Sequence, residues 1–148
     1  MPKPGTPRTL LIVEDELLYL ELAVLHCEKI GFDVISARTV DEALMLMNDL
    51  KTVDLTPKIV DAIWLDHFLP EKNGDVFAKE ILQHDEWKNI PIFLVTNAVE
   101  SEIINWYMRA GIKQTYPKLT TKPEQIASSI DLYLQTHSPN RSPETIRT

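Results

Sequence analysis

Two short apolar stretches of this chain each end in acidic residues. Asp66 follows the run Ala62–Leu65, and Glu14 and Asp15 follow the run at residues 10–13. A carboxylate at the tip of a buried strand faces a loop and not the core, and binding residues of rigid scaffolds tend to lie on such loops. Two strands that both end in acid predict a divalent cation between them.

The residue types in this pattern suit phosphoryl chemistry. Carboxylates held close together repel each other unless a cation compensates, and Mg²⁺ prefers hard oxygen ligands while keeping waters and phosphate oxygens. A carboxylate can also attack phosphorus and form an aspartyl phosphate. Such a transfer depends on positioning and on neutralising the phosphoryl oxygens. Lys118 and Thr96, which follow two later apolar stretches, supply a cation and a hydroxyl for that task.

The elements that must position these residues alternate between strand and helix patterns five times. Thr39 with Glu42, and Thr121 with Glu124, have the spacing of capping boxes. Strands are expected near residues 10–13, 32–36, 59–66, 91–96 and 113–116, and helices near residues 16–30, 39–50, 74–83, 101–110 and 121–136.

Apolar strands joined by helical crossovers predict an α/β fold with a doubly wound parallel sheet that is covered on both faces. The functional site of such a sheet lies beyond the carboxyl ends of its strands. Asp15, Asp66 and Thr96 would all lie at that edge. Pro117 cannot donate to a strand ladder, so it predicts that the last strand is at an edge of the sheet.

Length and composition limit the number of domains and the kinds of partner that the chain can have. The 148 residues favour one domain, expected at 9–137 between flexible tails at 1–8 and 138–148. The net charge of −7 weighs against nucleic-acid binding. The sequence has neither an apolar run long enough for a membrane span nor a signal-peptide pattern, so we expect a cytoplasmic protein without membrane contact. The single cysteine, Cys27, is expected to pack as a small apolar side chain.

Four short motifs in the expected order resemble those of response-regulator receiver domains, the CheY-like superfamily. Thr96 lies thirty residues after Asp66, and Lys118 lies twenty-two residues after Thr96, which are spacings typical of the family. The resemblance covers about residues 8–135 and implies a flavodoxin-like (βα)5 fold with strand order 2-1-3-4-5. The motifs are Leu11-Ile12-Val13-Glu14-Asp15-Glu16, Asp66-x-x-x-Pro70-x-x-x-Gly74, Val95-Thr96-Asn97 and Lys118.

The resemblance also implies a metal site and a phosphoryl acceptor. Asp66 would accept a phosphoryl group from a sensor histidine kinase or a phosphotransfer protein. Asp15 would bind Mg²⁺ directly together with Asp66, Glu14 would bind it through a water, and Phe68 would contribute its backbone carbonyl. The chain would be no enzyme beyond self-phosphotransfer and autodephosphorylation.

The remaining family positions concern the phosphoryl group and the output. Lys118 would pair with the phosphoryl group, and Thr96 would form a hydrogen bond to it and shift the region around helix 101–110. Asn97 is larger than the small residue usual at its position, so it is a candidate for narrowing the access of water. Little chain remains after the last helix, so we expect a stand-alone receiver that controls a protein partner.

Besides Asn97, two positions depart from the family pattern. Leu119, in place of a proline, follows Lys118, and a cis bond there would cost about 2.5–4 kcal/mol, so this loop is expected to differ. The position of the family's switch aromatic, three before the lysine, is Thr115. The neighbouring Tyr116 is therefore a possible substitute.

The predicted helix at 101–110 carries more apolar side chains than one buried stripe requires. The surplus is a candidate face for a partner or a homodimer, together with the last strand and the last helix. We assign this face to Ile104, Trp106 and Tyr107.

Three other functions can be compared with this pattern of residues. A receiver-like adaptor that docks without phosphorylation stays open, because Thr115 and Leu119 depart from the family pattern. A haloacid-dehalogenase-like phosphatase needs a second acid two residues after its nucleophile, where this chain has Phe68. A flavodoxin-type site is disfavoured because the acidic first loop would repel the FMN phosphate. His67 is expected to pack or to face solvent.

Overall fold

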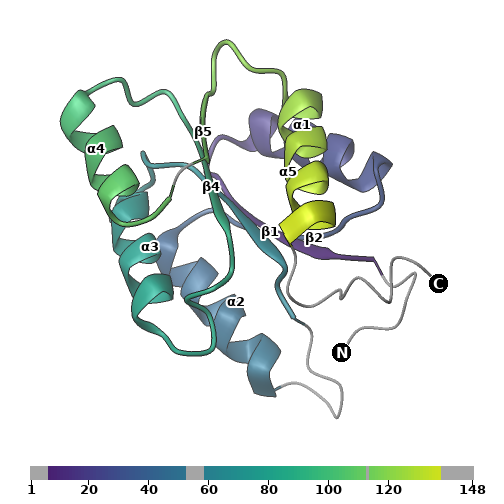
Figure 1. Cartoon of the computed structure of the whole chain (residues 1–148), viewed down its shortest axis with the longest axis horizontal. Coiled ribbons are helices and arrows are strands. Elements are labelled where there is room, and N and C mark those ends of the chain that lie inside the picture. The colour runs from purple at the N-terminus through teal and green to yellow at the C-terminus, as the bar shows by residue number, and fades with distance from the viewer. Residues whose placement is uncertain (1–6, 53–58, 113, 138–148) are drawn as a thin grey trace.

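A computed structural model describes residues 7–52, 59–112 and 114–137 of the chain. Its five strands form one parallel sheet in the order β2-β1-β3-β4-β5, which confirms the predicted doubly wound topology (Figure 1). The strands are β1 (Thr9–Val13), β2 (Asp33–Ala37), β3 (Ala62–Leu65), β4 (Ile92–Thr96) and β5 (Gln114–Pro117). The helices are α1 (Leu17–Lys29), α2 (Val40–Thr52), α3 (Gly74–Gln83), α4 (Ser101–Arg109) and α5 (Pro123–His137).

The burial of each strand follows from its place in the sheet. The central strands β1, β3 and β4 are buried along their whole length, whereas the edge strands β2 and β5 are partly exposed. This explains why the central strands read as continuous apolar runs. Pro117 ends β5 at the edge of the sheet, as predicted. Strand β3 is shorter than the predicted 59–66.

The two faces of the sheet carry separate hydrophobic cores. Helices α1 and α5 cover one face, and α2, α3 and α4 cover the other (Figure 1). On the first face Cys27 is fully buried, as predicted, among residues of α1 and α5. On the second face Phe77 of α3 and Tyr107 of α4 are fully buried. The two cores pack against opposite faces of the same sheet, whose parallel strands have their carboxyl ends at one edge.

The strand register brings the predicted site residues together. Val13 of β1 pairs with Leu65 of β3, and Leu65 pairs with Leu94 of β4. Thr96 of β4 pairs with Pro117 of β5. The residues that follow these pairs therefore leave the sheet at the same edge, as expected for parallel strands.

One of the two predicted capping boxes begins its helix. The Thr39 hydroxyl oxygen accepts a hydrogen bond from the Glu42 amide at 3.0 Å. Helix α5 instead begins at Pro123, a favourable first helical residue, and Lys122 N donates to Gln125 Oε1 at 3.3 Å. Within the described part of the chain, no hydrogen bond joins Thr121 to Glu124, so that prediction was wrong.

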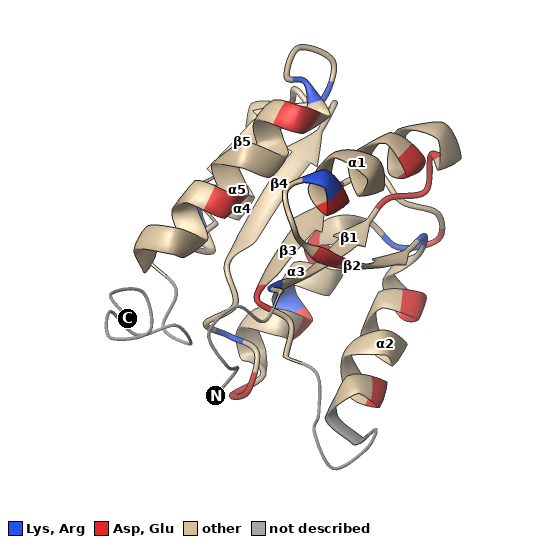
Figure 2. Cartoon of the chain, turned by 90° about the vertical axis from the view of Figure 1, so that its right-hand side faces the viewer, with Lys and Arg blue, Asp and Glu red and all other residues tan. Residues whose placement is uncertain are grey.

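Acidic residues lie on α1, α2 and α5, as the red bands in Figure 2 show. None of the helices that the structure describes combines the length and the apolar character needed to cross a lipid bilayer. Residues 1–6 and 138–148, which make up most of the predicted tails, lie outside the described residues.

Candidate functional site

The three predicted carboxylates gather at the carboxyl edge of the sheet. Oxygen atoms of Glu14, Asp15 and Asp66 all lie within 4.8 Å of one another. The Asp66 amide donates to the carbonyl oxygen of Val13 at 3.1 Å, and the Glu14 amide donates to that of Ala37 at 3.0 Å. These bonds continue the strand ladders, so the backbone fixes the acidic side chains near one another.

Lys118 reaches the same point from the end of β5. Its Nζ lies 2.7 Å from Glu14 Oε1 and 3.2 Å from Asp66 Oδ2. The side chain of Lys118 is 8% exposed, and its amide donates to the carbonyl oxygen of Thr96 at 3.0 Å. The described residues contain no cis peptide bond, so the bond between Lys118 and Leu119 is trans. Lys118 contacts Glu14 and Asp66 in this conformation.

The pKa values in this group reflect burial and pairing. Burial raises the pKa of Glu14, although the hydrogen bond from Lys118 acts in the opposite direction. For Lys118, burial alone favours the neutral amine, but the Glu14 hydrogen bond and the charge of Asp66 outweigh it, so its pKa is raised. Lys118 is therefore a cation at neutral pH.

The ring of Tyr19 on α1 lies against the same ammonium group. Lys118 Nζ is 4.6 Å from the centroid of the Tyr19 ring, which is within the range of a cation–π contact. Tyr19 also contacts Trp64 of β3 edge to face, with ring centroids 6.4 Å apart. No motif in the sequence points to Tyr19. The only available signal was its place one helical turn after Asp15.

The cluster fits a divalent cation with oxygen ligands. Asp66 Oδ1 is buried, and no hydrogen-bond donor of the described residues reaches it. Glu14 Oε2 accepts from the Glu16 amide at 2.9 Å, which fixes that carboxylate. One ammonium group cannot neutralise three carboxylates, so further positive charge is favourable here. Hard oxygen donors in this arrangement suit Mg²⁺.

The other predicted phosphoryl-site residues lie at the end of β4. Thr96 is buried, and its Oγ1 accepts a hydrogen bond from the Ala98 amide at 3.2 Å. Its own hydroxyl hydrogen remains available to a second acceptor. Asn97 is exposed. The Phe68 side chain is also exposed and touches the His67 ring, with centroids 5.0 Å apart.

Two of the predicted roles do not agree with the structure. Tyr107 is fully buried and cannot belong to an exposed partner face, while Ile104 and Trp106 are half-buried and pack against the core. Tyr116 packs against the core under α1 and α5. It therefore lies on the sheet face opposite α4, because neighbouring residues of a strand point to opposite faces. It cannot replace the missing ring at Thr115.

His67 was not assigned a role, yet it is an organised part of this region. It is 6% exposed, and its Nδ1 lies 2.7 Å from the Tyr107 hydroxyl. Burial lowers the pKa of His67. No spacing rule relates two residues that are forty positions apart, so no sequence pattern predicts this pair.

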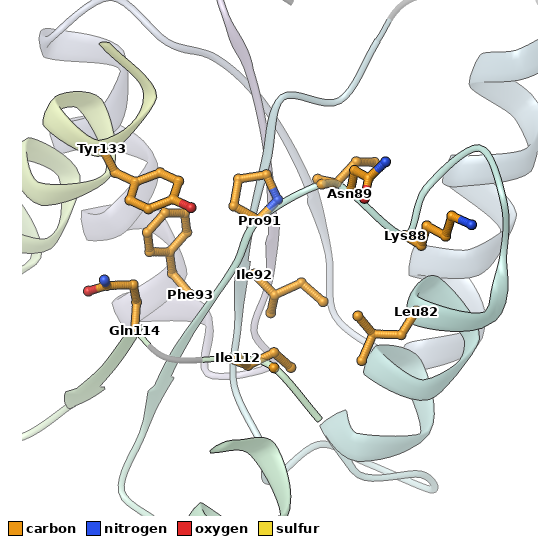
Figure 3. Close-up of a pocket in the computed structure, with 11 residues that line it drawn as sticks. Leu82, Lys88, Asn89, Pro91, Ile92, Phe93, Ile112, Gln114 and Tyr133 are labelled. Atoms are coloured by element: carbon orange, nitrogen blue, oxygen red, sulfur yellow. The ribbon is translucent and has the colours of Figure 1, made fainter. Parts of the chain in front are cut away.

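A cavity of about 320 Å³ lies elsewhere, at the amino ends of β4 and β5. Figure 3 shows it between Pro91, Ile92, Phe93, Leu82 and Tyr133. Because parallel strands bring their carboxyl ends to the opposite edge, this cavity is not part of the acidic cluster.

Comparison with known families decides the identity of this arrangement. Residues 10–131 match the response regulator receiver domain family. The chain belongs to that family. It is the receiver domain of a two-component response regulator, and receiver domains bind Mg²⁺ at an acidic pocket.

Two response regulators are similar to the chain in sequence, with different identities and coverages. A protein named "Probable C4-dicarboxylate response regulator DctR" from Halalkalibacterium halodurans is 30% identical over 103 residues, which are 69% of this chain and 41% of that protein. The phosphate regulon transcriptional regulatory protein PhoB of Escherichia coli K12 is 26% identical over 139 residues, which are 94% of this chain and 57% of that protein. This receiver chain thus spans only about half the length of these relatives.

A solved structure shares the fold. The phosphorylated cyanobacterial phytochrome response regulator RcpA aligns with a TM-score of 0.75 and 19% identity. The alignment covers 90% of this receiver domain and 99% of that chain.

Proposed function

We propose that this receiver domain is a phospho-acceptor switch in which Asp66 takes a phosphoryl group from a sensor histidine kinase or a phosphotransfer protein. The observation that carries the proposal is the Lys118 ammonium group, which bridges Glu14 and Asp66 beside Asp15. A nucleophilic carboxylate, a fixed cation and additional acids for a metal are the parts that such a transfer needs. Transfer from a kinase draws on ATP, so we place the protein in the cytoplasm.

In the transfer step, a carboxylate oxygen of Asp66 forms a bond to phosphorus while the bond from phosphorus to the donor's histidine nitrogen breaks. Lys118 stabilises the charge on the phosphoryl oxygens from its position against Asp66 Oδ2. Asp15, Asp66 and the Phe68 carbonyl would hold Mg²⁺, with Glu14 acting through a water. When bound, the metal supplies further positive charge to those oxygens.

The output follows from the residues beside the acceptor. The phosphoryl group adds about two negative charges and strong acceptor oxygens. The Thr96 hydroxyl would donate to one of them, which would move the loop that leads into α4. Asn97 lies at the exposed start of that loop and would limit the access of water. The α4–β5–α5 face would then change its affinity for a protein partner or for a second copy of the chain.

A second candidate is an adaptor that docks through α4 without phosphorylation. It is favoured by the lack of a ring at Thr115, because Tyr116 lies on the other face of the sheet. The intact cluster of three carboxylates and Lys118 disfavours it, since docking alone needs no buried charged group of this kind.

Intact mass separates the two candidates. The chain is incubated with Mg²⁺ and phosphoramidate or acetyl phosphate, and we expect the gain of one phosphoryl group. The gain should disappear in Asp66→Asn and with EDTA, whereas Asp75→Asn, which alters an aspartate outside the cluster, should keep it. No gain in the unaltered chain, with small donors and with candidate kinases, would favour the adaptor.

A further inference from the structure

Helix α4 is tied to the residue that follows the phosphoryl acceptor. Tyr107, in the second half of α4, places its hydroxyl 2.7 Å from Nδ1 of His67. Tyr107 is 0% exposed and His67 is 6% exposed, so water does not compete for this bond. The two rings also meet edge to face, with centroids 5.6 Å apart at 88°.

The groups around this contact are closely packed. A Cβ atom on Gly74 would lie 2.3 Å from the Asp66 carbonyl oxygen and 3.0 Å from the Tyr107 hydroxyl. The Gly74 amide donates to the His67 carbonyl oxygen at 2.7 Å. The end of β3, the start of α3 and the second half of α4 therefore meet at one point next to Asp66. Closely packed groups of this kind transmit a displacement and do not absorb it.

Helix α4 has a second attachment to the phosphoryl site at its beginning. Thr96 is joined to Ala98 by a hydrogen bond of 3.2 Å, and the Ile103 amide donates to the Glu100 carbonyl oxygen at 3.1 Å. The start of the helix is thus attached near Thr96, whereas its second half is attached to His67. His67 is the residue after Asp66, and Thr96 ends the strand that pairs with β3.

We propose that the His67–Tyr107 hydrogen bond positions α4 relative to the phosphoryl acceptor and couples the two. This inference rests on the proposed function. Movement of Thr96 toward the phosphoryl group shifts the start of α4, and the Tyr107 hydroxyl acts as the pivot. The second half of the helix then rotates, and with it the exposed Met108 and Arg109.

The bond suits this role because it is buried and directional. Breaking it would leave a donor and an acceptor without partners inside the protein, which is unfavourable. The helix therefore turns about this point and does not slide past it. Of the contacts to α4, this one depends on a single oxygen atom, so Tyr107→Phe removes it while keeping the ring in place.

Hydrogen exchange of the full chain, followed by mass spectrometry of the peptide that spans α4, tests the coupling. Exchange is measured before and after phosphorylation with Mg²⁺ and phosphoramidate, and intact mass records the phosphoryl group in every sample. In the unaltered chain we expect phosphorylation to change exchange across residues 101–109. In Tyr107→Phe we expect this difference to fall by more than half at equal phosphorylation. His67→Asn, which keeps a polar atom near Nδ1, should retain most of it.

The matched control is Tyr133→Phe, which removes a tyrosine hydroxyl on α5, on the other face of the sheet, and should leave the α4 difference unchanged. An undiminished difference in Tyr107→Phe would overturn the inference. So would faster exchange that is equal in both states, because the hydroxyl would then only stabilise the helix. If Tyr107→Phe folds poorly, His67→Leu gives the same readout from the other partner. If the unaltered chain gains no phosphoryl group, the proposed function itself fails, and the coupling fails with it.

Discussion

The two faces of the sheet meet the acceptor site through tyrosines that make different contacts. On the face covered by α1 and α5, Tyr19 lays its ring against Lys118, and its buried hydroxyl has no partner among the described residues. On the face covered by α2, α3 and α4, Tyr107 uses its hydroxyl to hold His67. One face thus contacts the cation of the acidic cluster, and the other face holds a helix to the residue after Asp66. Substitutions that remove a ring or only a hydroxyl should separate these two roles.

The largest effect is expected at Lys118, which lies between the two faces. Lys118→Ala leaves Glu14 and Asp66 without their cation, and loss of such an electrostatic contact typically slows the reaction on the order of a hundredfold. The measurement is the rate of phosphoryl gain from phosphoramidate at saturating Mg²⁺. Lys72→Ala is the control, because Lys72 pairs with Asp41 on the surface. Equal rates of phosphoryl gain in the two variants would show that Lys118 has no role in the transfer.

The α1 and α5 face should respond to alkaline pH through Cys27. Burial raises the pKa of this thiol from 9.0 to about 12. Between these values the folded chain keeps the proton and the unfolded chain loses it, so stability falls as the pH rises. From pH 7 to about 10.5 the thiol should cost the folded state about 2 kcal/mol. Urea unfolding across this range should show a shallower decline in Cys27→Ala. Parallel declines would contradict the burial of the thiol.

The two tyrosine hydroxyls should differ in their effect on stability. Tyr107→Phe removes a buried hydrogen bond and leaves Nδ1 of His67 without its partner. This change should lower the free energy of unfolding by about 1–2 kcal/mol. Tyr19→Phe should change it little, because that hydroxyl has no partner within the described chain. Urea denaturation of both variants checks the contrast. A similar loss in both would mean that the two faces do not differ in this respect.

The smallest effect concerns the ring of Tyr19. Tyr19→Leu removes the cation–π contact and should slow phosphoryl gain about fivefold, which corresponds to about 1 kcal/mol. Tyr19→Phe keeps the ring and should react like the unaltered chain. Tyr133→Leu removes a tyrosine that packs against the same core without touching Lys118, so it controls for general loss of packing. If Tyr19→Phe is as slow as Tyr19→Leu, the hydroxyl and not the ring is responsible.

The fold and the centre of the site could be predicted from the sequence for a physical reason. A buried parallel strand leaves a continuous apolar run, and parallel strands bring their carboxyl ends to one edge. The gathering of Glu14, Asp15 and Asp66 follows from these two rules, and the motif spacing added Lys118. Metal binding, the access role of Asn97 and the identity of the partners stay predictions.

The positions of the aromatic side chains could not be predicted in the same way. Trp106, Tyr107 and Met108 are consecutive apolar residues of α4, and the helical spacing from Ile103 and Ile104 places Tyr107 on the face toward the core. The prediction treated the apolar surplus of this helix as an exposed face and did not apply that spacing to Tyr107. What the spacing does not predict is the partner of the buried hydroxyl, His67, which lies forty residues away in the sequence. The side of the sheet on which Tyr116 lies likewise depends on the register of β5, which no local pattern specifies.

The most direct test of the central claim locates the phosphoryl group within the chain. Borohydride reduces an acyl phosphate to an alcohol, so treatment after phosphorylation with Mg²⁺ and phosphoramidate marks the modified carboxylate as homoserine. Peptide mapping by tandem mass spectrometry then identifies it. We predict reduction at residue 66 alone, and no reduction when EDTA is present during the phosphorylation step. Reduction at Asp15, at another acid, or nowhere in a chain that is otherwise folded would contradict the account.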